Sequence, residues 1–168
     1  MTKLYFILVL IIVLIFLFTN CTVFEHASYS KSYSGVLDLS EWSFERHGTV
    51  DLDGEWEFYW NQFLYSSDFK MEKNVSVKDY IQVPDTWNST GLEDGFRRKG
   101  FATFRLLVHL GPDNIGKLAF KILDISTACK VFINGKEVYT SGTTGLTKNT
   151  TIPGYSPGIA RFETYADD

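Results

Sequence analysis

The residues best suited to ligand chemistry lie between positions 87 and 105 of this sequence. Trp87 and Asn88 follow a Val-Pro pair; an indole ring can stack on a sugar, and an amide can hydrogen-bond its hydroxyls. The neighbouring Arg97 and Arg98 carry guanidinium groups, which can hold a carboxylate through two parallel hydrogen bonds. Arg105 points away from the Phe104 face of its predicted strand and could line a concave surface. The candidate ligand-binding residues are therefore Trp87, Asn88, Arg97 and Arg105.

The expected partner of these residues is a small carbohydrate or carboxylate, or another protein. Two plainer interpretations stay open. Trp87 can instead close the core from a loop, and Arg97 can simply be solvated.

Patterns that support catalysis are sparse in the sequence. It contains no H-E-x-x-H zinc motif, G-x-x-x-x-G-K-[ST] phosphate loop or C-x-x-C pair. The run Gly154-Tyr155-Ser156-Pro157-Gly158 has G-x-S-x-G spacing, but it lies in a Pro-rich loop, whereas that nucleophile motif requires a strand-to-helix turn. Glu55 and Glu57 share one face of a predicted strand, whereas a glycosidase needs its two carboxyl groups across a sugar-binding cleft. We expect this pair to be a solvated polar face. The chain is thus predicted not to be an enzyme, and to hold no cofactor and no metal.

The N-terminus has the pattern of an export signal. Lys3 gives a short basic start, an apolar run extends from Leu4 to Phe18, and Cys21 stands directly after Asn20. The run is short for a spanning helix, which needs about 20 residues. A cysteine at this point is the lipidation site of bacterial lipoproteins, although a small residue usually precedes it.

We therefore predict a signal peptide or signal anchor over residues 1–20 and lipidation at Cys21, with an uncleaved anchor or ordinary cleavage as alternatives. Each alternative places the remainder on the periplasmic or outer side of a membrane, attached to that membrane if the chain is acylated or uncleaved. Residues 21–34 are rich in serine without a clean period and are expected to form a polar tether. The folded domain is expected to span residues 35–168.

Alternating apolar side chains predict that this domain is built from β-strands. The pattern is present in residues 55–60, 101–110 and 117–122, with one apolar and one polar face in each run. Turns are expected at Asp53-Gly54, at Gly111–Asn114 and at Asn134-Gly135, the last a strong two-residue hairpin signal. Evidence for helices is limited to short turns near residues 41–44 and 59–69. The pattern predicts an all-β sandwich or jelly roll.

Composition limits the function further. With 16 Lys and Arg against 20 Asp and Glu, the net charge is -4, which argues against a nucleic-acid-binding protein. An apolar fraction of 45% is enough for a packed core. Two cysteines cannot make a disulfide-rich scaffold, and Cys129 is expected to be a buried, inert thiol.

Several segments, in the same order, resemble those of a known family. They are residues 35–44, 50–60, 83–88, 100–106 and 127–136, which include the runs DLSEW, EWEFYW, VPDTWN and FING. This order resembles the extracytoplasmic sensor domain of bacterial seven-transmembrane receptors with diverse intracellular signalling modules. It is more weakly similar to the sugar-binding domain of glycoside hydrolase family 2. The resemblance implies a galactose-binding-like jelly-roll β-sandwich.

The chain departs from that family after the domain. No second long apolar run follows, and the last strands of the resembled fold are expected to be missing. The expected function is therefore a non-catalytic, extracytoplasmic ligand-sensing or ligand-binding domain without a membrane bundle or output domain. The alternatives are the carbohydrate-binding module of a truncated or split glycoside hydrolase, and a vestigial structural fragment.

Overall fold

The structure, a computed structural model, describes residues 30–70, 75, 79–86, 100–123 and 125–165. It is built mostly of β-strands with a few short helices, which confirms the predicted all-β class. In the described ranges no helix is long and apolar enough to cross a membrane. The elements are β1 (Val36–Leu39), α2 (Phe44–His47), β2 (Gly54–Trp60), α3 (Ser66–Lys70), β3 (Asp79–Val83), β4 (Ala102–Arg105), β5 (Leu107–Leu110), η1 (Pro112–Asn114), β6 (Gly116–Ile122), β7 (Cys129–Ile133), β8 (Lys136–Ser141) and β9 (Gly158–Thr164).

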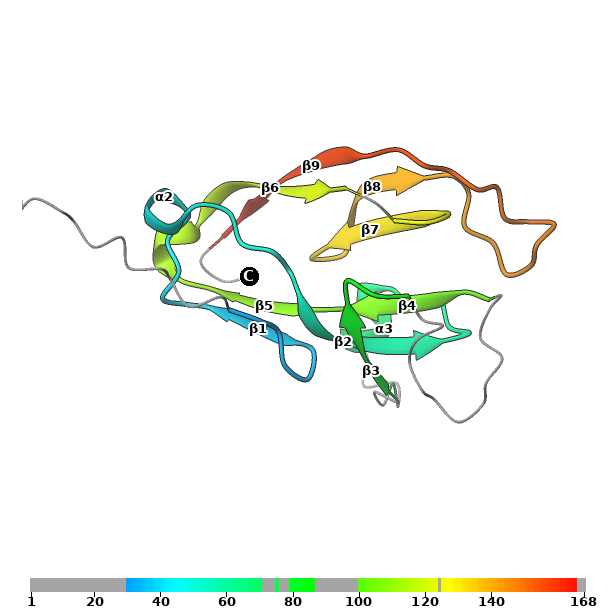
Figure 1. Cartoon of the computed structure of the whole chain (residues 1–168), viewed down its shortest axis with the longest axis horizontal. Coiled ribbons are helices and arrows are strands. Elements are labelled where there is room, and N and C mark those ends of the chain that lie inside the picture. Colours follow the sequence, from blue (N-terminus) through cyan, green and yellow to red (C-terminus); the bar gives the residue numbers. More distant parts are fainter. Residues whose placement is uncertain (1–29, 71–74, 76–78, 87–99, 124, 166–168) are drawn as a thin grey trace, which may run out of the picture.

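The strands form two layers (Figure 1). The lower layer contains the antiparallel sheet β3-β2-β4 and the parallel pair β1-β5. The upper layer contains the antiparallel pairs β6-β9 and β7-β8. Gly158 of β9 packs against the ring of Tyr139 on β8, which brings the two upper pairs together.

The core lies around β2, the central strand of its sheet. Phe58 is fully buried and is paired with Phe104 of β4, and the two rings meet edge to face at 5.1 Å between centroids. Ile81 of β3 and the β1 residues Leu37 and Leu39 are also buried. Burial of such side chains contributes about 1.5–3 kcal/mol each.

The expected single strand over residues 101–110 is divided in two at Leu106. Its first half, β4, pairs with β2, and its second half, β5, pairs with β1 in parallel. The amide of Leu107 donates to the carbonyl of Gly35 at 2.9 Å, which starts the new pairing. The predicted alternation is correct on β5, but on β4 the expected core residue Phe104 is 37% exposed. The pattern also could not show that one run serves two partner strands.

The predictions for β6 and for the last hairpin are confirmed. On β6, Lys117, Ala119 and Lys121 are exposed, and the residues between them are more buried. Asn134 and Gly135 join β7 to β8 with φ of 48° and 83°, the left-handed region that a two-residue type I′ turn requires.

The predicted turn at Asp53-Gly54 is wrong as a hairpin. Gly54 begins β2, and no strand precedes it in residues 50–53. Instead, Ser32 is buried there: its amide donates to the Asp53 carbonyl at 2.8 Å, and its carbonyl accepts from Glu55 at 2.9 Å. A Cβ on Gly54 would lie 2.3 Å from the Ser32 carbonyl oxygen, so glycine permits this close approach. The packed region thus includes the last residues of the segment expected to be a tether.

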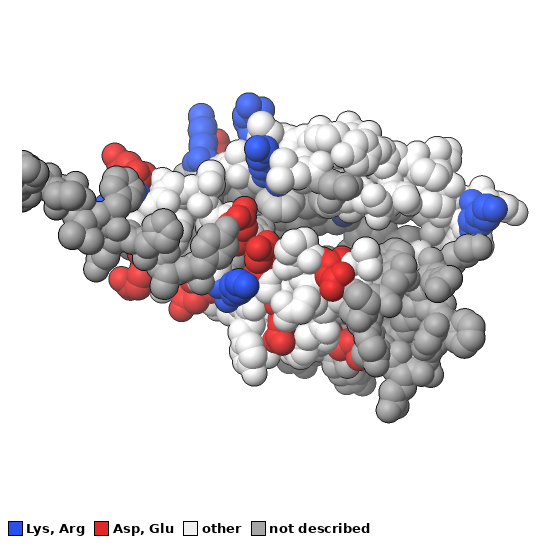
Figure 2. All heavy atoms as spheres, in the orientation of Figure 1, with Lys and Arg blue, Asp and Glu red and all other residues white. Residues whose placement is uncertain are grey.

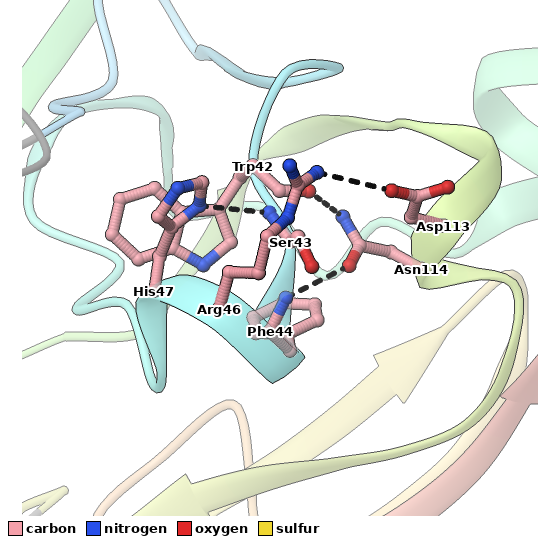
Figure 3. Close-up of polar contacts among 7 residues, drawn as sticks. All are labelled: Trp42, Ser43, Phe44, Arg46, His47, Asp113 and Asn114. Atoms are coloured by element: carbon pink, nitrogen blue, oxygen red, sulfur yellow. Dashed lines mark hydrogen bonds and ion pairs between the residues drawn. The ribbon is translucent and has the colours of Figure 1, made fainter.

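A polar cluster joins α2 to η1 (Figure 3). The amide of Asn114, a buried side chain, donates to the Trp42 carbonyl, and its Oδ1 accepts from the backbone of Phe44 at 3.1 Å. Beside it, Arg46 and Asp113 form an exposed ion pair at 3.2 Å. Asn114 therefore satisfies two backbone groups at the start of a helix that has no side-chain cap.

We predict that Asn114→Ala destabilises the fold by about 1–3 kcal/mol, because it leaves the part-buried carbonyl of Trp42 and amide of Phe44 without their partner. Asp113→Ala is the matched control: it removes only the exposed ion pair, which contributes less than about 1 kcal/mol. Thermal unfolding of the full chain in mild detergent, followed by near-ultraviolet circular dichroism, measures both. Equal midpoints for the two variants would contradict the assignment.

Candidate ligand-binding site

The site is assembled on one face of the sheet β3-β2-β4. Glu57 of β2 is paired with Tyr80 of β3 on one side and with Arg105 of β4 on the other, so the three side chains form a row. Glu55, two residues earlier on the same face, is paired with Gln82. These five residues are referred to below as the Arg105 face.

A buried ion pair fixes the centre of the Arg105 face. Nη1 of Arg105 donates to both carboxylate oxygens of Glu57, at 2.9 and 2.8 Å. The Glu57 side chain is 11% exposed and the Arg105 side chain 35% exposed. The expectation that Glu55 and Glu57 form a solvated polar face is therefore wrong for Glu57.

Three neighbours exclude water from the Glu57 carboxylate. Gly35 packs so closely that a Cβ there would lie 2.5 Å from Cγ of Glu57. The hydroxyl of buried Tyr59 donates to the carboxylate at 2.9 Å. The ring of Phe69, from α3, lies 4.7 Å from the Arg105 guanidinium and meets Tyr59 edge to face. The polar side of β2 is thus covered by β1 and α3, which no local pattern reveals.

The environment of Tyr59 raises the pKa of its hydroxyl. Burial, with the hydrogen bond and negative charge of Glu57 as further causes, raises the pKa of Tyr59 to about 12. The phenol, already protonated at neutral pH, therefore stays protonated and donates to Glu57 further into the alkaline range. The carboxylate accepts from a guanidinium and a phenol at once.

The outer edge of Arg105 stays available. In the described ranges, the guanidinium bonds Glu57 through Nη1 and also lies against the Tyr59 hydroxyl, whose pKa it lowers, and no hydrogen bond from Nη2 or Nε is seen. Tyr80 is 45% exposed and Gln82 is also exposed, while Oε2 of Glu55 accepts from the Ser34 amide at 3.0 Å. The face thus offers an aromatic ring, an amide and guanidinium donors, groups of the kind that bind a polar small molecule.

The other predicted residues lie outside the described part of the chain. Trp87, Asn88 and Arg97 belong to the connection between β3 and β4, and Cys21 lies before residue 30. That connection leaves β3 at Val83, paired with Gly54 at the start of β2, and enters β4 at Ala102, paired with Trp60 at its end. Their contribution to the Arg105 face stays a prediction.

The remaining reactive groups do not add chemistry to this face. Over the described ranges, no group of three or more His, Cys, Asp and Glu side chains could hold a metal ion. Cys129 is a free, half-buried cysteine on β7, and burial raises the pKa of its thiol. Burial thus keeps this thiol protonated and a poor nucleophile.

Sequence reasoning selected Arg105 but missed Tyr80, Tyr59 and Phe69. Tyr80 alternates with the buried Ile81 in the run from Asp79 to Val83, which is a usable strand signal. Its position beside Glu57, however, depends on the register of β2 and β3.

Comparison with known proteins adds no assignment: no family model, curated protein or solved structure matches the chain. The geometry of the Arg105 face therefore has to carry the functional argument.

We predict that Arg105→Leu destabilises the fold by about 3–5 kcal/mol, because it leaves the Glu57 carboxylate buried without its cation. Adding Glu57→Leu to that variant should recover part of the loss, since the unpaired charge is then removed. Thermal unfolding of the single and double variants forms a double-mutant cycle. Strictly additive losses would show that the two side chains do not act as a pair.

Stability should also fall at alkaline pH through Tyr59. Its folded pKa is raised, so its contribution is complete below about pH 10 and is lost as pH rises toward 12. A shift of about two units corresponds to about 2–3 kcal/mol. We expect Tyr59→Phe to lose less stability than the native chain between these pH values. Parallel pH profiles of the two unfolding midpoints would refute this role.

Proposed function

We propose that this chain is a non-catalytic, extracytoplasmic binding domain that takes up a small polar ligand on the Arg105 face. The observation that carries the proposal is the half-used guanidinium of Arg105. Glu57 holds Nη1, the Tyr59 hydroxyl and the Phe69 ring lie against the group, and no hydrogen bond from Nη2 or Nε to a described residue is seen. A donor fixed in this way loses little conformational freedom when a ligand binds.

The charge of the face favours a hydroxyl-rich, neutral ligand such as a carbohydrate. Two carboxylates, Glu55 and Glu57, accompany the single cation Arg105, so an additional ligand carboxylate would meet net negative charge. The exposed ring of Tyr80 offers a surface for stacking on a sugar, and Gln82 offers an amide for its hydroxyls. A carboxylate ligand is the second candidate, supported by the free Nη2 and Nε of Arg105.

The two-layer arrangement of strands supports, as part of this proposal, a galactose-binding-like jelly-roll sandwich of the kind found in receptor sensor domains. In this proposal residues 1–20 direct export, acylated Cys21 or the uncleaved signal attaches the chain to a membrane, and Trp87, Asn88 and Arg97 complete the ligand site. A sensing role follows the resemblance to receptor domains. The carbohydrate-binding module of a split glycoside hydrolase would use the same face.

The proposal predicts that the full chain in detergent micelles binds members of a panel of neutral and carboxylated oligosaccharides. Tyr80→Ala and Arg105→Lys should each weaken binding at least tenfold, because one removes the stacking ring and the other replaces the planar fork with a single ammonium. Arg161→Lys, on the upper layer, is the matched control and should bind as the native chain does. Isothermal titration calorimetry measures all four proteins.

Two results would contradict the proposal. One is a folded native chain that binds no member of the panel. The other is binding that is unchanged in both Tyr80→Ala and Arg105→Lys, with near-ultraviolet circular dichroism confirming that each variant is folded.

A further inference from the structure

The two layers of the structure carry opposite net charge. The described residues of 30–115, which contain the lower-layer strands, have 4 Lys and Arg against 11 Asp and Glu, a net charge of -7. The described residues of 116–164, which contain the upper-layer strands, have 6 against 2, a net charge of +4. Figure 2 shows basic side chains projecting from the upper layer, with acidic ones gathered mainly over the lower layer and one end of the molecule.

The positive charge of the upper layer is concentrated on the exposed face of the β6-β9 pair. Cross-strand pairing places Lys117 opposite Glu163, Ala119 opposite Arg161 and Lys121 opposite Ile159, and all six side chains are exposed. None of the three basic residues forms an ion pair with another described residue. We call these six residues the basic face.

The exposed face of the β1-β5 pair has the opposite character. Val36 is paired with Leu107 and Asp38 with His109, and all four side chains are exposed. Glu41 follows β1 and is exposed as well. Hydrogen bonds from Ser40 lower the pKa of Asp38, so its negative charge is retained at mildly acidic pH. Val36, Asp38, Glu41, Leu107 and His109 are called the acidic face.

The two faces complement each other in apolar surface as well as in charge. Ile159 is 55% exposed on the basic face, and Leu107 is 42% exposed on the acidic face. In each face these side chains lie beside charges that the other face can neutralise. Exposed aliphatic groups beside opposite charges are what a specific protein contact buries.

A single copy cannot bring the two faces together, because the β6-β9 and β1-β5 pairs lie in opposite layers (Figure 1). We propose that the basic face of one copy of this chain docks on the acidic face of another. Such a contact is heterologous, so each copy of a dimer keeps one face free, and further copies extend the assembly into an open row or a closed ring. The complementary surface is present in the chain itself, and this favours a second copy over an external polyanion.

The test is sedimentation velocity of the full chain in density-matched detergent. The native chain should grow beyond a dimer with rising concentration at 50 mM salt. At 500 mM salt it should need at least tenfold more protein, because salt screens the contact. Lys121→Glu/Arg161→Glu reverses the basic face and should stay monomeric, as should Asp38→Lys/Glu41→Lys on the acidic face. Lys136→Glu/Lys148→Glu makes the same change in net charge on upper-layer residues outside the basic face and should assemble as the native chain does.

Mixing the two face variants provides the deciding measurement. Each has two faces of like sign, so neither assembles alone, but the mixture again offers faces of opposite sign and should associate. A native chain with one copy per micelle at every concentration overturns the proposal. So do face variants that assemble normally, a mixture that stays monomeric, or native chains that bind anionic lipid vesicles without associating with each other.

Discussion

The ion pair between Glu57 and Arg105 is the constraint on which the lower layer depends. It links the central strand β2 to β4, and its carboxylate is largely shielded from water while its guanidinium is 35% exposed. Buried ion pairs add little net stability, because the cost of desolvation offsets much of the Coulomb attraction. Their effect on register is larger. A slip of one residue in β4 would turn Arg105 toward the apolar side that Phe58 occupies, leaving the Glu57 carboxylate without its cation.

The same constraint extends to the strands beyond β2. Only Leu106 separates β4 from β5, so fixing β4 also fixes where β5 begins beside β1. Gly35 completes the connection from the other side: it packs on Glu57, and its carbonyl accepts from the Leu107 amide. A side chain at residue 35 would have no room beside the carboxylate. One ion pair thus lies where β1, β2, β4 and β5 converge.

The alternation of apolar and polar residues predicted where strands form, but it did not predict which strand faces are exposed to solvent. The exposed face of β6 and the Asn134-Gly135 turn follow from neighbouring residues alone, and both were predictable. Alternation correctly placed Glu57 and Glu55 on the same side of the strand, but it predicted that both carboxylates are exposed to solvent. Glu57 is buried instead, because Gly35 packs against it and Phe69 covers its partner Arg105, and both residues are distant from it in sequence. The hairpin predicted at Asp53-Gly54 was wrong for a related reason. Gly54 has a positive φ because the backbone of Ser32, distant in sequence, packs closely against it.

The candidate site shows the same division between local and distant information. Arg105 was recognisable as a potential ligand contact from its place opposite the apolar side of its strand. Its fixed geometry was not, because the carboxylate, the phenol and the ring that hold it come from β2 and α3. Since Glu57 engages only Nη1, the ligand binding proposed above would leave the ion pair unbroken. Because Glu57 neutralises Arg105, the guanidinium attracts anions less strongly. Shape and hydrogen bonding, rather than charge, would then determine which ligand binds.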